Sequence, residues 1–221
     1  MGRNDLGAKA AFSHTGSLVG RDEVYDAAFK KSGITRVDDL FSMIDTAKTL
    51  SMQPLPKGNR VCILTEAGGP GSMAMDELGK FQQLQLAHIS DEGKKKLQNL
   101  LPEIALVCEP DGYTDMTAAA MAEQHADALE VVLKESEVDA IILISVPPTF
   151  LPPKDVANAL LNRNFKTDKP ILTCFLAGKW VWEARKILES SKWPTFDTPE
   201  QAVRTLAKMV DRANYLKDLE E

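Results

Sequence analysis

Residues 60–72 read RVCILTEAGGPGS and join a short apolar run to a glycine-rich turn and then to a helical pattern. The apolar run, residues 60–65, shows no alternation of polar and apolar side chains, which is typical of a strand buried on both faces of a parallel sheet. Two similar runs follow at residues 138–146 (VDAIILISV) and 170–175 (PILTCF). The three runs together predict buried strands of one parallel sheet.

Helical patterns separate these strands. We expect helices over residues 72–83, 90–100, 118–134, 154–162, 179–190 and 198–216, weaker strands at 86–89 and 195–196, and a loop over 109–117. Strands that alternate with helices imply right-handed crossovers on one sheet. The predicted fold class is therefore α/β: a flavodoxin-like, doubly wound parallel sheet with an N-terminal helical appendage.

The N-terminal quarter has a different pattern. Residues 1–20 are rich in Gly, Ala and Ser and cannot form a core by themselves, whereas residues 22–31 and 38–50 carry apolar side chains at helical spacing. Residues 53–58 (QPLPKG) form a linker, since two prolines and a glycine interrupt any regular element. We place a domain boundary there, between residues 1–53 and 58–221.

Composition limits the class of protein. The chain has 221 residues and a net charge of −6, which argues against nucleic-acid binding. No apolar run approaches the roughly 20 residues that span a bilayer, so we expect no membrane segment. Three cysteines (Cys62, Cys108 and Cys174) are widely spaced, which predicts no metal site and suits a reducing compartment, the cytoplasm.

The glycine-rich turn is a candidate anion site. Gly68, Gly69, Gly71 and Ser72 lie between a strand and a helix, where free N–H groups and the positive end of the helix dipole favour negative charge. The spacing matches neither the dinucleotide-binding nor the P-loop pattern. The alternative is a tight strand-to-helix turn that binds no ligand.

His14 is a candidate phosphoryl carrier. It lies in residues 13–20 (SHTGSLVG), where small residues around it would leave the imidazole accessible in a flexible loop. A partly unprotonated imidazole can attack a phosphoryl group and later release it. The alternative is a surface histidine without a role. We expect His88 and His125 to be structural.

Two carboxylates lie at predicted strand or loop ends near this site. Glu66 follows the strand at 60–65, where its charge would repel phosphate unless it holds an imidazole ring. Asp115, in a loop that leads into a helix, is either a capping residue or a group that orients the histidine or a substrate.

Several motifs resemble a known family. Residues 7–20 (GAKAAFSHTGSLVG), 22–29, 55–71 and 113–117 (YTDMT) are similar to segments of the NDP-forming acyl-CoA synthetases, in particular the α-type region of the ADP-forming acetate–CoA ligases, which are related to succinyl-CoA synthetase. The resemblance covers nearly the whole chain. It implies that residues 1–53 are the tail of a first flavodoxin-like domain that carries the phosphohistidine segment, and that residues 58–221 are a second such domain.

The resemblance also implies an activity. An acyl-CoA thioester and phosphate give acyl phosphate and CoA, and the phosphoryl group passes through His14 to ADP. The helix after Gly68 would receive the phosphorylated segment. CoA, ADP or ATP and phosphate would be substrates, no cofactor would be tightly bound, and magnesium would come with the nucleotide on an ATP-grasp domain or subunit. A CoA-binding domain or subunit and an oligomeric assembly are further expected partners.

A non-catalytic docking module is the alternative function. It would bind partner subunits through the apolar faces of residues 24–29 and 40–50. If residues 1–50 fold onto the core with His14 near Gly69, the catalytic function is favoured; if they splay away, a docking role or a fragment artefact is favoured.

Overall fold

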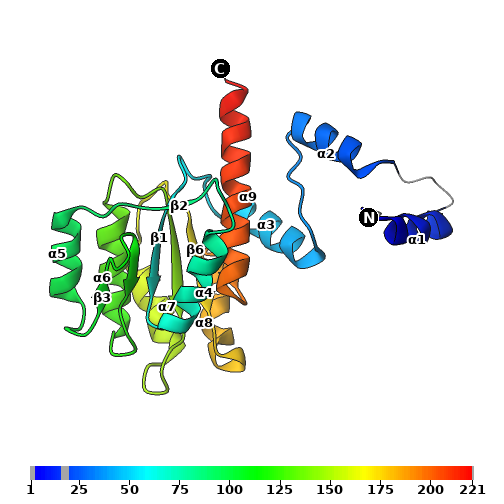
Figure 1. Cartoon of the computed structure of the whole chain (residues 1–221). Coiled ribbons are helices and arrows are strands. Elements are labelled where there is room, and N and C mark those ends of the chain that lie inside the picture. Colours follow the sequence, from blue (N-terminus) through cyan, green and yellow to red (C-terminus); the bar gives the residue numbers. More distant parts are fainter. Residues whose placement is uncertain (1–2, 16–19, 221) are drawn as a thin grey trace.

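The computed structural model describes residues 3–15 and 20–220 and shows a mostly parallel sheet between two layers of helices (Figure 1). Seven strands of the described chain form the sheet, in the order β3-β4-β1-β5-β6-β7, with β2 also paired to β1. Their bounds are β1 Arg60–Thr65, β2 Gln85–Leu86, β3 Leu106–Val107, β4 Tyr113–Asp115, β5 Ala140–Ser145, β6 Ile171–Phe175 and β7 Thr195–Phe196. The predicted α/β, flavodoxin-like class is confirmed.

Helices cover both faces of the sheet. The helices of the described chain are α1 Asp5–Thr15, α2 Asp22–Lys31, α3 Leu40–Met52, α4 Gly68–Leu78, α5 Asp91–Leu100, α6 Ala122–Leu133, α7 Pro153–Asn162, the 3-10 helix η1 Gly178–Val181, α8 Trp182–Ser190 and α9 Pro199–Asp218. Helices α4 and α9 bury their apolar side chains on one face, and α5 to α8 on the other. The apolar runs at 60–65, 138–146 and 170–175 thus form buried strands, as predicted, and these lie at the centre of the sheet.

The loop predicted over residues 109–117 is wrong, because part of it forms β4. Strand β4 pairs in parallel with the carboxyl half of β1, matching Ile63 with Tyr113, whereas β2 pairs only with Arg60 and Val61. Strands β2 and β4 therefore pair with successive parts of the same side of β1. Strand β3 runs antiparallel to β4 and forms an edge of the sheet, so the sheet is mixed.

The N-terminal segment lies partly outside this core. Helix α3 packs against α9, while α1 and α2 lie beyond it, with α1 well apart from the sheet (Figure 1). No regular element was predicted before residue 22, but residues 5–15 form a helix, consistent with the high helix propensity of their alanines. Within the described residues, no helix is both long and apolar enough to cross a membrane.

Candidate functional site

The glycine-rich turn forms the first turn of α4. The helix begins at Gly68, directly after β1, and not at Ser72 as predicted. Ala67 precedes it without a side-chain cap, so the N–H groups of Gly68 and Gly69 have no partner inside the helix. The N–H of Gly71 donates to the Ala67 carbonyl at 3.2 Å. Among the predicted phosphate-binding residues, Gly68 and Gly69 thus offer free backbone donors, and Ser72 contributes an exposed side chain.

Gly71 is required for packing. A Cβ atom at this position would lie 2.5 Å from the Tyr113 Oη atom and 2.9 Å from the Thr65 Cγ2 atom, closer than carbon atoms approach in proteins. A Cβ atom on Gly69 would meet nothing within 4 Å. The two glycines therefore differ: Gly71 lets α4 lie close to β1 and β4, and Gly69 leaves open space in front of the helix.

Asp115 lies beside the same turn. Its Oδ1 atom accepts from the Thr117 N–H at 2.9 Å, and its Oδ2 atom lies 3.0 Å from the place of a Cβ atom on Gly68. Burial, and then the neighbouring Asp115 charge, raise the pKa of Tyr113. The structure thus places Asp115 beside Gly68 at the N-terminal end of α4, where a carboxylate is attracted by the helix dipole.

Glu66 is buried behind this turn and holds an imidazole. Its Oε2 atom lies 2.5 Å from Nε2 of His125, and its Oε1 atom accepts from the Ser145 hydroxyl at 2.8 Å. The other ring nitrogen of His125 lies 2.9 Å from the Met121 carbonyl oxygen. Sequence reasoning missed the His125 contact with Glu66. The available signal was its place on the buried face of α6, which it shares with Leu129 and Val132.

His14 does not reach the turn in this structure. It lies exposed in the last turn of α1, where a flexible loop was expected, and α1 lies apart from the sheet (Figure 1). Gly16, predicted to make this loop flexible, lies outside the described residues. The structure therefore brings most of the predicted site residues together at the carboxyl ends of β1 and β4: Glu66, Gly68, Gly69, Gly71, Ser72 and Asp115. It leaves His14 apart from them, on α1.

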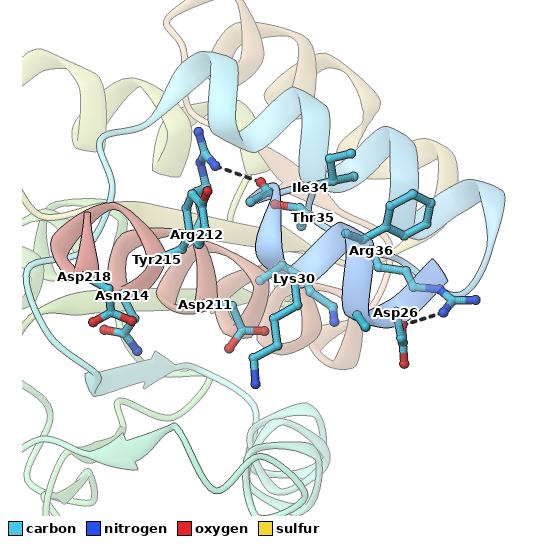
Figure 2. A pocket seen from close by; sticks show the side chains of 14 residues that line it. Asp26, Lys30, Ile34, Thr35, Arg36, Asp211, Arg212, Asn214, Tyr215 and Asp218 are labelled. Atoms are coloured by element: carbon cyan, nitrogen blue, oxygen red, sulfur yellow. Dashed lines mark hydrogen bonds and ion pairs between the residues drawn. The ribbon is translucent and has the colours of Figure 1, made fainter. Parts of the chain in front are cut away.

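A cavity lies away from the carboxyl ends of β1 and β4. It measures about 550 Å³ and lies between residues 26–36 and the end of α9 (Figure 2). Arg212 donates to the Gly33 carbonyl at 2.8 Å, and Arg36 pairs with Asp26 on its wall. None of the predicted site residues lines it. Across residues 3–15 and 20–220, no cluster of three His, Cys, Asp or Glu side chains could hold a metal ion.

These features define an α/β domain of flavodoxin-like architecture with an uncapped, glycine-rich helix start at the carboxyl end of β1. Residues 1–50 match the succinyl-CoA ligase like flavodoxin domain. The chain is 37% identical to acetate–CoA ligase [ADP-forming] II subunit alpha of Pyrococcus furiosus, over 96% of this chain and 46% of that protein. It is 32% identical to 4-hydroxybutyrate–CoA ligase [ADP-forming] of Nitrosopumilus maritimus, over 98% of this chain and 30% of that one.

Solved structures agree. PH0766 from Pyrococcus horikoshii OT3 matches with a TM-score of 0.83 and 33% identity, over 90% of this chain and 45% of that chain. Acetyl-coenzyme A synthetase 1 of Ca. Korarchaeum cryptofilum, in complex with phosphate and ADP, matches with a TM-score of 0.88 and 27% identity, over 100% of this chain and 48% of that one.

The predicted resemblance is therefore confirmed. The chain is a relative of the ADP-forming acetate–CoA ligases and corresponds to a region of their α subunits. It spans about half the length of the α subunits that it matches, and less of the other ligases.

Proposed function

We propose that this chain is the part of an ADP-forming acyl-CoA synthetase that carries and receives the phosphoryl group. The overall reaction converts acyl-CoA, ADP and phosphate to the free acid, CoA and ATP. The observation that carries the proposal is the match to acetate–CoA ligase α subunits over nearly the whole chain, together with the two free N–H groups at the start of α4.

His14 is the proposed phosphoryl carrier. Phosphate first displaces CoA from the thioester and gives acyl phosphate. An imidazole nitrogen of His14 then attacks the phosphorus atom, and the carboxylate of the acid leaves. A terminal phosphate oxygen of ADP next attacks the phosphohistidine, which frees the imidazole and forms ATP. The exposure of His14 fits a group that must meet partners on two sides.

The first turn of α4 is the proposed receiving site. The N–H groups of Gly68 and Gly69 donate to phosphate oxygens, the Ser72 hydroxyl adds a donor, and Asp115 accepts from an N–H of the His14 ring. This arrangement requires His14 to travel to the turn, or to reach the turn of a second copy. It also fits the division into residues 1–53, the tail of one flavodoxin-like domain, and residues 58–221, a second.

The remaining components belong to other domains or subunits. An ATP-grasp unit supplies ADP or ATP with its magnesium ion, and a further unit binds CoA. The solved Korarchaeum structure in complex with phosphate and ADP supports these two substrates by analogy. We place the assembled oligomer in the cytoplasm, in keeping with the three free and buried cysteines of the described chain.

Phosphoryl labelling tests the proposal. The chain is mixed with an ATP-grasp subunit of an ADP-forming acetate–CoA ligase and radiolabelled ATP, and wild type is compared with H14A and with the control S13A. We expect a label that is acid-labile and base-stable, lost completely in H14A and kept in S13A. A label that resists acid, or one that survives in H14A, contradicts the assignment.

A docking module is the second candidate, favoured by the position of α1 and by the exposed side chains of α3. Leu40, Phe41 and Ile44 on that helix are all more than half exposed. If a folded chain takes up no label beside an active ATP-grasp subunit, the docking function replaces the catalytic one.

A further inference from the structure

A buried acid–base pair lies directly behind the first turn of α4. The side chains of Glu66 and His125 are both fully inaccessible to solvent, and Ser145 beside them is buried as well. An isolated carboxylate in such a place is strongly unfavourable, so its charge must be compensated by a neighbour or by a proton.

The hydrogen bonds fix where the protons are. The Met121 carbonyl can only accept, so the ring nitrogen 2.9 Å from it, Nδ1 of His125, carries a proton. Between Nε2 of His125 and Oε2 of Glu66, 2.5 Å apart, one further proton must lie, because two acceptors would otherwise face each other. Whether that proton rests on nitrogen or on oxygen, the pair has a net charge of zero.

This neutral pair lies where an uncompensated negative charge would weaken anion binding at the first turn of α4. Glu66 is two residues before Gly68, and its contacts tie the end of β1 to the end of β5 and the start of α6. A lone carboxylate there would oppose an anion on the Gly68 and Gly69 N–H groups through the low-dielectric interior. Asp115 is also near the turn, but it is partly exposed and therefore screened by water.

We propose that His125 neutralises Glu66, and that the two are positioning residues which make the turn before α4 able to bind an anion of the phosphate class. This inference rests on the proposed function, since it concerns the same receiving site. Neither side chain touches the anion. Their role is to keep the region behind the turn neutral and to hold the turn, whose N–H groups contact the anion, in its orientation.

The test is a charge cycle read out by binding of inorganic phosphate, measured by calorimetry and by shifts of the Gly68 and Gly69 amide resonances. E66Q keeps the hydrogen bonds without a charge, H125Q leaves the carboxylate uncompensated, and E66Q/H125Q is neutral again. We expect E66Q and the double variant to bind within about threefold of wild type, and H125Q to bind about tenfold or more weakly. E77Q, at the other end of α4, removes a buried carboxylate that pairs with the partly exposed Arg204; it is the matched control and leaves binding unchanged.

Three results overturn the inference, and they are distinguishable. If wild type binds no phosphate at the turn, the receiving site itself is wrong, and the inference with it. If wild type and H125Q bind equally, the site stands and the neutralising role is wrong. If E66Q/H125Q is as weak as H125Q, the histidine acts through packing. Should H125Q not fold, recovery of the fold in E66Q/H125Q supports the neutralisation, and an unfolded double variant refutes it.

Discussion

The sheet domain and the N-terminal segment both contain amphipathic helices, but these helices differ in how much of their apolar face is buried. Helix α9 buries a continuous stripe of side chains from Pro199 to Val210, whereas α2 buries none. Helix α3 touches α9 on one side, but its Leu40 is 62% and its Phe41 69% exposed. The difference teaches that sequence amphipathicity creates an apolar face without providing the surface that covers it.

The contrast also separates two kinds of site. At the carboxyl ends of β1 and β5, Glu66 and Ser145 are buried and joined by a hydrogen bond, and Glu66 is also hydrogen-bonded to His125 of α6. His14 stands on a helix that makes no extensive contact with the sheet among the described residues. The phosphoryl relay proposed above needs a receiving site that is held in place and a carrier that can reach it, and three pairs of substitutions can sharpen or break this comparison.

The largest effect is expected in the core. L143A removes a fully buried side chain from β5 and should lower the free energy of unfolding by about 2–5 kcal/mol. F41A removes an exposed ring from α3 and should change it by less than about 0.5 kcal/mol. Urea unfolding of the isolated chain measures both. A large loss in F41A would show that the N-terminal segment is part of the same cooperative core.

The next effect concerns the two glycines of the receiving turn. G71A places a methyl group 2.5 Å from the Tyr113 hydroxyl and should destabilise the fold by about 1–3 kcal/mol. G69A meets open space and should be neutral or stabilising by up to about 1 kcal/mol, because alanine restricts the unfolded chain. Thermal unfolding compares the two. Equal destabilisation would mean that α4 does not lie against β1 and β4 as described.

The smallest effect is a pH dependence. Burial alone would raise the pKa of Glu77, but hydrogen bonds from Arg204 and Lys80 outweigh it and hold the pKa below its ordinary value. Because the folded pKa is lowered, the stabilisation is present above the unfolded pKa of about 4.3 and is lost as the pH falls through the folded value.

E77Q should therefore cost about 1 kcal/mol at pH 7 and flatten the loss of stability between about pH 5 and pH 3. Unfolding free energies measured across that range check this. R36Q is the comparison in the N-terminal segment, where Arg36 pairs with Asp22 and Asp26 at the surface, and it should change stability less than E77Q does. An unchanged acid limb in E77Q would contradict the argument.

Much of the fold was predictable because the long strands are continuous apolar runs. Strands β1, β5 and β6 and the helices between them follow from residues 60–65, 138–146 and 170–175. Strand β4 did not, since residues 113–115 (YTD) are few and polar, and only pairing with β1 makes them a strand. The start of α4 was predicted at Ser72 instead of Gly68, because glycine and proline are typical of turns, although the first turn of a helix tolerates both.

The candidate site was predictable only in its local parts. The glycine-rich turn and the carboxylate of Glu66 are visible as neighbours in sequence, and a partner imidazole for Glu66 was anticipated in kind. His125 was not identified as that imidazole, because it is 59 residues away in sequence and only the packing of α6 on the sheet joins them. Contacts of this range depend on how the elements assemble, which periodicity does not report.

The length of α9 has a consequence for the order in which the protein is made. Past Val210, the last turns of α9 no longer bury side chains in the sheet domain. They contact the segment around Gly33 instead. Arg212 donates to the Gly33 carbonyl, and a Cβ atom on Gly33 would lie 2.1 Å from the Tyr215 ring. During synthesis the segment around Gly33 leaves the ribosome early, and this neighbour appears more than 170 residues later. The segment around Gly33 therefore stays undocked until the last turns of α9 have been made.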